Sequence, residues 1–182
     1  VSAAPVRRLV GKTEAITMGD PLVRENWLGP VIDQKAVDRH QAAVAEARRD
    51  GRVFTGGERL SDRGMDRGFY VEPTVVGLPA EHRLFRDELF APFTAVAAVD
   101  SFDDAIRLAN ASVYGLTAGV YSENTDEVQR FLDHAEAGVL YVNRRAGATT
   151  GAWPGGQAFG GWKGYGAHST AGLPGYDAAP RS

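Results

Sequence analysis

The spacing of apolar residues changes several times along this chain. In four segments apolar residues recur every three or four positions, which predicts amphipathic helices. These segments are residues 5–16, 34–49, 101–110 and 124–137. Five shorter runs are rich in β-branched and aromatic residues, which predicts strands. These runs are residues 53–55, 69–76, 93–99, 117–121 and 139–142.

Local signals fix several expected boundaries. Asp33 and Ser101 each precede an apolar periodic segment, so both are expected to cap a helix, and either Asn124 or Thr125 is expected to cap another. Pro73 cannot donate a hydrogen bond to a neighbouring strand, which predicts an edge or a bulge at that point.

The order of elements predicts the fold class. From residue 93 onward it is strand, helix, strand, helix, strand, which is typical of parallel strands joined by right-handed crossovers. The run 93–99 is almost entirely apolar, as in strands buried on both faces. We therefore predict an α/β fold of three layers, a mostly parallel sheet with helices on both faces. Open sheets of this kind bind ligands at the carboxyl ends of their strands.

Residues 86–93, Arg-Asp-Glu-Leu-Phe-Ala-Pro-Phe, form what we call the acid–aromatic turn. Within it, Glu88 can accept hydrogen bonds from two neighbouring hydroxyls, and Phe90 offers a flat apolar face. This pair suits a ribose joined to a planar ring. The alternative is that Glu88 is an ordinary surface acid and Phe90 staples the turn to the protein.

The rest of the composition mainly excludes functions. The net charge of -3, with both signs interspersed, predicts neither nucleic acid nor an anionic membrane as partner. No apolar run has membrane-spanning length, and a cytoplasmic location is expected. The sequence has no cysteine, so these residues hold no disulfide, thiolate metal site or thiol nucleophile. The four histidines show no metal-ligand spacing and are interpreted as structural or exposed. They are His40, His82, His134 and His168.

A glycine-rich segment follows the last expected strand. We assign residues 1–143 to the α/β portion and 144–182 to a loop and tail of the same domain. In this segment Gly151 and Ala152 can present backbone N–H groups to a carboxylate. Phe159 and Trp162 flank two glycines and can wall an apolar site, or the same residues form a turn packed over the end of the sheet.

Several motifs in this order resemble the C-terminal part of the NAD(P)-dependent aldehyde dehydrogenases, and the match covers nearly the whole chain. Within that superfamily, residues 143–163 look most like the 1-pyrroline-5-carboxylate dehydrogenases, which oxidise glutamate semialdehyde to glutamate. The motifs are Met18-Gly19-Asp20-Pro21, Leu28-Gly29-Pro30-Val31-Ile32, Gly68-Phe69-Tyr70-Val71-Glu72-Pro73-Thr74, Asp87-Glu88-Leu89-Phe90-Ala91-Pro92, Asn110, Tyr114-Gly115-Leu116-Thr117-Ala118-Gly119-Val120, Gly138-Val139-Leu140-Tyr141-Val142-Asn143 and Phe159-Gly160-Gly161.

The resemblance implies a cofactor site. Glu88 matches the family's glutamate that binds the nicotinamide-side ribose, and Phe90 matches the aromatic residue beside it. Arg39 falls near a helix position that approaches the cofactor ribose in relatives. The implied cofactor is NAD, with NADP not excluded, because the residues that meet the adenosine ribose lie elsewhere in the family.

The resemblance also implies a substrate site and a missing partner. Gly151 and Ala152 match the anchor for the substrate carboxylate, and Phe159 matches a wall of the aldehyde tunnel. The family's nucleophilic cysteine, its general-base glutamate and its main Rossmann domain lie upstream of the matched region. We therefore expect this chain to be inactive alone and to need the N-terminal dehydrogenase portion, on the same or a companion chain, in a homo-oligomer. The alternative is a non-catalytic remnant that serves as an association or nucleotide-binding module.

Overall fold

The computed structural model describes residues 3–62, 64–144 and 161–163 of the chain. These residues fall in two compact units, one within Val1–Val99 and the other within Asp100–Ser182. Each unit has its own helices, its own small sheet and its own cluster of buried apolar side chains. The predicted mixture of helices and strands is therefore confirmed.

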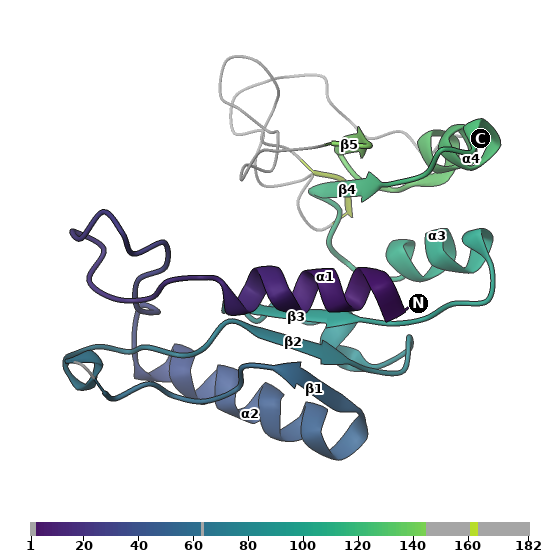
Figure 1. Cartoon of the computed structure of the whole chain (residues 1–182). Coiled ribbons are helices and arrows are strands. Elements are labelled where there is room, and N and C mark those ends of the chain that lie inside the picture. The colour runs from purple at the N-terminus through teal and green to yellow at the C-terminus, as the bar shows by residue number, and fades with distance from the viewer. Residues whose placement is uncertain (1–2, 63, 145–160, 164–182) are drawn as a thin grey trace, which may run out of the picture. The chain divides into compact units, whose positions relative to one another are not determined.

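The first unit is built around a three-stranded sheet. Its central strand, β2, pairs antiparallel with β1 and parallel with β3. Helices α1 and α2 both contact β1 and β2, and they lie on opposite sides of the sheet (Figure 1). Neighbouring strand residues point to opposite faces, so the burial of both Val75 and Val76 shows that both faces are covered. The elements are α1 (Ala3–Glu14), α2 (Gln34–Asp50), β1 (Arg52–Thr55), η1 (Met65–Arg67), β2 (Thr74–Gly77), η2 (Arg83–Phe85) and β3 (Phe93–Val96).

Helix α2 forms for reasons visible in the sequence. The side chain of Asp33 caps it by accepting a hydrogen bond of 2.8 Å from the backbone N–H of Ala36, as predicted. Its apolar stripe faces the sheet, where Ala43 and Ala47 join a core cluster with Val76, Leu78 and Leu84. Burying this stripe stabilises the helix more than intrinsic propensity does.

The largest fully buried side chain is His40, on the same face of α2. Its Nε2 lies 3.0 Å from Thr74 Oγ1, and its Nδ1 lies 3.3 Å from the side-chain nitrogen of Gln41. The hydroxyl of Thr74 donates onward to the carbonyl of Glu72. Because Gln41 donates to Nδ1, the neutral ring carries its proton on Nε2 and donates it to Thr74. His40 is therefore structural, as predicted.

We expect His40 to make the stability of the chain depend on pH. Burial lowers the pKa of its imidazole below the ordinary value, because desolvation disfavours the charged ring. The unfolded chain therefore binds a proton near about pH 6.5 that the folded chain does not. The free energy of unfolding should be level above about pH 7 and should fall below about pH 6.5, by at most about 1.4 kcal/mol per pH unit.

Urea unfolding at a series of pH values measures this effect. The variant His40→Gln cannot titrate, so its loss of stability in this window should be clearly smaller than that of the unmodified chain. The matched control is His134→Gln, because His134 is exposed. An unchanged pH dependence in His40→Gln would contradict the prediction.

The described residues of the second unit form two helices and two parallel strands. These are α3 (Phe102–Asn110), β4 (Thr117–Val120), α4 (Thr125–His134) and β5 (Val139–Val142). Ser101 caps α3 through Asp104 N–H at 3.0 Å, as predicted. Of the two candidate caps for α4, the structure selects Asn124, whose side chain accepts from Asp126 N–H at 2.9 Å.

Asn110 joins the end of α3 to the end of α4. Its amide nitrogen donates to the carbonyl of His134 at 2.7 Å, and its amide oxygen accepts from Glu136 N–H at 2.9 Å. The ammonium group of Lys163 donates to the carbonyls of Asn110 and Ser112. The described part of the glycine-rich segment is thereby tied to α3.

The structure corrects three expectations about the sheet. Among the described residues the strands form two small sheets rather than one. The antiparallel pairing of β1 is compatible with the prediction of mostly parallel strands, since the other two pairings are parallel. The strand expected at 69–76 is shorter and begins after Pro73, at Thr74. Strand β3 is not buried on both faces, because Thr94 interrupts its apolar run and is exposed. The two-residue period of a strand places Thr94 on the face opposite Phe93 and Ala95, which pack against the α2 cluster.

One expectation about the helices was also wrong. Helix α4 ends at His134 rather than near residue 137. Ile106 on α3 and Phe131 on α4 are buried, whereas Ala109 and Leu132 are exposed. The two-stranded sheet is narrow, so each helix buries a narrower stripe against it than the sequence pattern implies.

Candidate functional site

The acid–aromatic turn lies at the start of a strand. Its last residue, Phe93, is the first residue of β3, and its Pro92 carbonyl accepts a hydrogen bond of 2.9 Å from Thr74 N–H at the start of β2. The turn therefore lies at the amino ends of two parallel strands. It is thus at the opposite end of these strands from the carboxyl ends, where open sheets of this kind generally bind ligands.

The turn presents Glu88 and Phe90 to solvent. Glu88 is exposed, and Phe90 is 82% exposed, so Phe90 does not staple the turn to the protein. That packing is supplied by Leu89, which is half-buried against the core cluster of the first unit. The apolar ring of Phe90 is thus left available for a ligand or another protein surface.

Phe90 also has a strained backbone. Its φ of 51° lies in the left-handed region, which costs a residue with a side chain about 1–2 kcal/mol. Such strain persists only where the surrounding structure holds it, and it is concentrated at binding and catalytic sites. Exposure and strain together make this turn the strongest candidate site in the described part of the chain.

Helix α2 brings Arg39 to the same turn. The Nε of Arg39 lies 3.4 Å from the carbonyl oxygen of Leu89, the residue between Glu88 and Phe90. Residues 39 and 89 are fifty positions apart in sequence, so only the fold brings them together. A carboxylate, an aromatic ring and a guanidinium group at one turn can bind hydroxyls, a planar ring and an anionic group.

The two neighbouring acids of the turn have different roles. Asp87 forms an ion pair of 2.5 Å with Arg83, which also pairs with Glu46 on α2. Asp87 is therefore part of the scaffold, although both Asp87 and Glu88 are exposed. The contacts with Glu46 and then with Asp87 raise the pKa of the Arg83 guanidinium, which stays charged.

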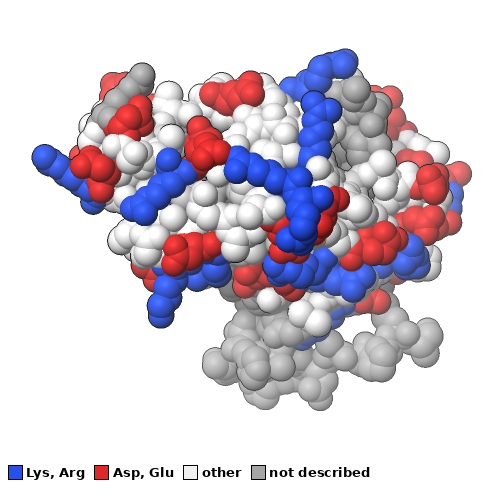
Figure 2. Space-filling view, turned by 90° about the horizontal axis from the view of Figure 1, so that it is seen from below, with Lys and Arg blue, Asp and Glu red and all other residues white. Residues whose placement is uncertain are grey.

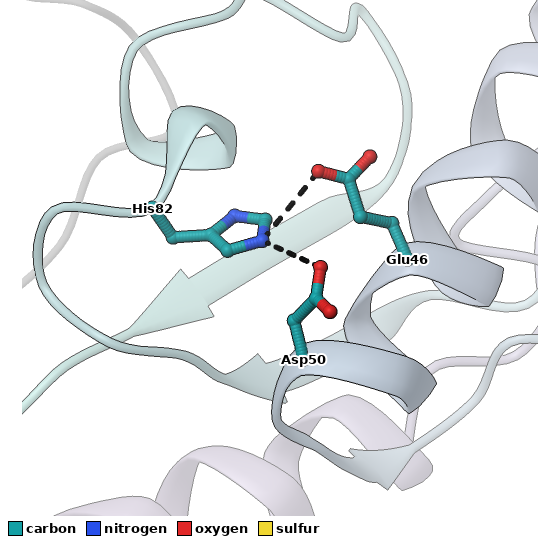
Figure 3. Close-up of side chains that lie close together, drawn as sticks. All are labelled: Glu46, Asp50 and His82. Atoms are coloured by element: carbon teal, nitrogen blue, oxygen red, sulfur yellow. Dashed lines mark hydrogen bonds and ion pairs between the residues drawn. The ribbon is translucent and has the colours of Figure 1, made fainter.

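Glu46, Asp50 and His82 form a cluster near this turn that the sequence did not reveal (Figure 3). His82 Nε2 lies 3.3 Å from Asp50 Oδ2 and 3.5 Å from Glu46 Oε1. The only sequence signal was the four-residue spacing of Glu46 and Asp50 on one helix, because His82 is 32 positions from Asp50. These ligand atoms lie within 4.8 Å of one another, which is compatible in distance with a metal site.

The chemistry of the cluster argues for ion pairing instead. Arg83 donates to Glu46, and Arg49 donates to Asp50 at 2.6 and 2.8 Å, which lowers the pKa of the Asp50 carboxyl. His82 Nδ1 accepts a hydrogen bond from Leu84 N–H, so the neutral ring carries its proton on Nε2. A metal ion at Nε2 would displace that proton and break the contact with Asp50.

The chain is similar to known proteins over nearly its whole length. The family described as "Aldehyde dehydrogenase family" matches residues 1–179. The chain belongs to the aldehyde dehydrogenase family. The 1-pyrroline-5-carboxylate dehydrogenase 1 of Halalkalibacterium halodurans is 36% identical over 172 residues, which cover 94% of this chain and 32% of that protein. The 1-pyrroline-5-carboxylate dehydrogenase of Bacillus mycoides is 38% identical over 173 residues, with the same coverage.

Solved structures give the same result. The crystal structure of 1-pyrroline-5-carboxylate dehydrogenase from Thermus with bound NAD superimposes with a TM-score of 0.75 and 30% sequence identity, covering 87% of this chain and 29% of that one. The chain thus spans about a third of the length of the curated aldehyde dehydrogenases that it matches. The resemblance inferred from the sequence motifs is confirmed.

Three further observations on this aldehyde dehydrogenase chain concern its predicted substrate residues, its surface charge and its helices. The predicted substrate residues Gly151, Ala152 and Phe159 lie outside the described residues. Figure 2 shows acidic and basic side chains intermixed over one face, with no broad area of a single sign. No helix in the part that the structure describes is long and apolar enough to cross a membrane.

Proposed function

We propose that this chain is the C-terminal part of an NAD-dependent aldehyde dehydrogenase catalytic domain that oxidises glutamate semialdehyde, formed from 1-pyrroline-5-carboxylate, to glutamate in the breakdown of proline. The observation that carries the proposal is the acid–aromatic turn, which exposes Glu88 and a strained Phe90 beside Arg39. The names of its relatives support the choice of substrate. The cytoplasm is the proposed location.

In this proposal the chain binds and orients the reactants. Glu88 accepts hydrogen bonds from the two hydroxyls of the nicotinamide-side ribose, while Phe90 packs against the ring that the ribose carries. Arg39 adds positive charge beside the cofactor. NAD, when bound, accepts a hydride from the substrate. NADP remains an alternative cofactor.

The substrate contacts proposed for this chain lie in the glycine-rich segment. Backbone N–H groups at Gly151 and Ala152 hold the substrate carboxylate, and Phe159 lines the path of the aldehyde. Family chemistry also needs a thiolate nucleophile and a base. The sequence contains no cysteine, so the nucleophile comes from the N-terminal dehydrogenase portion, within a homo-oligomer. The three-layer arrangement of the sheet stays a prediction for that complete domain.

The test is an assay of a fused dehydrogenase. We define this protein as the present chain joined to the part of the Halalkalibacterium relative that it does not match. The fused dehydrogenase should form NADH from glutamate semialdehyde, whereas the present chain alone should form none. Replacing the nucleophilic cysteine of the added part by serine should abolish activity. NADH formation by the present chain alone would overturn the proposal, and a folded fusion that neither binds nor reduces NAD would favour the non-catalytic alternative.

A further inference from the structure

Three hydrogen bonds tie the acid–aromatic turn to neighbouring elements, in addition to the backbone hydrogen bonds from Arg86 and Asp87 N–H to the Arg83 carbonyl and the packing of Leu89 on the core cluster. At its end, Thr74 N–H donates to the carbonyl of Pro92. In its middle, Arg39 donates to the carbonyl of Leu89. At its beginning, the carboxylate of Asp87 is bound by Arg83. The first contact joins two backbone groups, whereas the second and third are made by the side chains of Arg39 and Arg83, which substitutions can remove.

Arg83 connects the turn to helix α2. Its Nη1 donates to Asp87 Oδ2 at 2.5 Å, and its Nη2 donates to Glu46 Oε2. The other oxygen of Glu46 faces His82 Nε2 at 3.5 Å, as Figure 3 shows. Arg83 lies in the short helix η2 and His82 caps it, so both oxygens of one α2 carboxylate are engaged just before the turn. Arg83 thus bridges Glu46 and Asp87, and the Glu46 end of this bridge is shielded from solvent, because the side chain of Glu46 is 14% exposed.

The second attachment on α2 lies two helical turns away. Arg39 and Glu46 are seven residues apart, a spacing that places both on the same side of a helix. One of them reaches the backbone within the turn, and the other reaches its first acid through Arg83. Helix α2 thus supports the turn on both sides of Glu88.

We propose that Arg83 is a positioning residue for cofactor binding, because its bridge between Glu46 and Asp87 holds Glu88 and Phe90 in their binding conformation. This inference rests on the proposed function. Arg83 itself touches no reactant. The strained φ of Phe90 needs such support, because a turn released from its anchors relaxes toward unstrained backbone.

Two variants of the fused dehydrogenase test the proposal. Arg83→Met removes both ion pairs and keeps an unbranched side chain of moderate length, and Asp87→Asn removes only the charge at the turn. Each should raise the KM for NAD about tenfold and leave kcat within about twofold. The reason is that the ion pair between Arg83 and Asp87 orders the turn before NAD binds and does not act on the reacting atoms. Arg49→Met is the matched control, since Arg49 pairs with Asp50 and makes no contact with the turn among the described hydrogen bonds and ion pairs. It should leave the KM unchanged.

If Arg83 only stabilised the fold, its loss would lower the unfolding temperature of the 182-residue chain. We instead expect thermal unfolding to stay nearly unchanged, because the side chain of Arg83 is 56% exposed. Hydrogen exchange of the Phe93 and Thr74 amides, which donate to the Ala91 and Pro92 carbonyls of the turn, should become faster in Arg83→Met and not in Arg49→Met. An unchanged exchange rate would overturn the proposal, and so would a fall in unfolding temperature that accounts for the kinetic change.

A double substitution separates this inference from the proposed function. Once Glu88→Gln has removed the ribose contact, adding Arg83→Met should change the KM for NAD little further. Full additivity of the two effects would overturn the positioning role. If Glu88→Gln raises the KM and Arg83→Met does not, the positioning role fails and the proposed function stands. If neither raises it, the proposed function fails and this inference falls with it.

Discussion

Replacing Glu88 by glutamine is expected to raise the KM for NAD of the fused dehydrogenase roughly tenfold to a hundredfold. Hydrogen bonds to a charged group contribute about 1.5–3 kcal/mol, and each 1.4 kcal/mol is a factor of ten. Glutamine has nearly the same shape, but it is neutral and has one acceptor oxygen in place of two. It therefore cannot offer a separate, charged oxygen to each ribose hydroxyl, and the hydrogen bonds that it accepts are weaker.

Steady-state kinetics with NAD as the varied reactant measures this effect. Glu81→Gln is the matched control, because Glu81 is an exposed acid in the same unit and outside the turn. It should leave the KM unchanged. Glu88 is exposed, so Glu88→Gln should not alter unfolding of the 182-residue chain. An unchanged KM in Glu88→Gln would remove Glu88 from the cofactor site.

The largest expected loss of stability comes from Gly56→Ala. Gly56 has a φ of +76°, and a Cβ at this position would lie 2.2 Å from the carbonyl oxygen of Pro73 and 3.0 Å from Thr74 Cα. These neighbours are backbone atoms at the start of β2, so they cannot swing aside. We expect Gly56→Ala to lower the free energy of unfolding by about 3 kcal/mol or more, from strain and overlap together.

Gly64 provides a matched control with the same backbone conformation. Its φ is +84°, but no atom lies within 4 Å of the position that an added methyl group would take. Gly64→Ala should therefore report backbone strain alone, at about 1 kcal/mol. Urea unfolding of both variants measures the difference. Equal losses would show that the start of β2 moves easily, which would contradict the role given to Thr74 as an anchor of the turn.

Local signals predicted the helices well, because caps and apolar spacing act within a few residues. Asp33 and Ser101 cap the helices that follow them, and both α2 and α3 lie close to their predicted ranges. The sheet was predicted less well. Strand pairing depends on contacts far apart in sequence, so the antiparallel β1 and the separate pair of β4 and β5 had no local signal.

The candidate site was predicted only in part, because some of its contacts join residues that lie far apart in sequence. The sequence motifs identify Glu88, Phe90 and Arg39, and the fold places them at one turn. The different role of Asp87 was not identified, because Glu46 lies 37 positions from the arginine that joins it to the turn. The sequence also left open whether Phe90 packs against the protein, because the exposure of an apolar residue in a polar stretch cannot be read from the sequence. In the structure Phe90 is exposed, so it does not staple the turn to the protein.

Phe90 has a further consequence for engineering this chain. Glycine would adopt its left-handed backbone without strain, so a search for greater thermal stability would favour Phe90→Gly. The same search would also replace the solvent-exposed aromatic side chain of Phe90 by a polar residue. With the proposed cofactor role of Phe90, selection for folding and selection for cofactor binding act in opposite directions at this residue. Stabilisation by design should leave position 90 unchanged and improve the chain elsewhere.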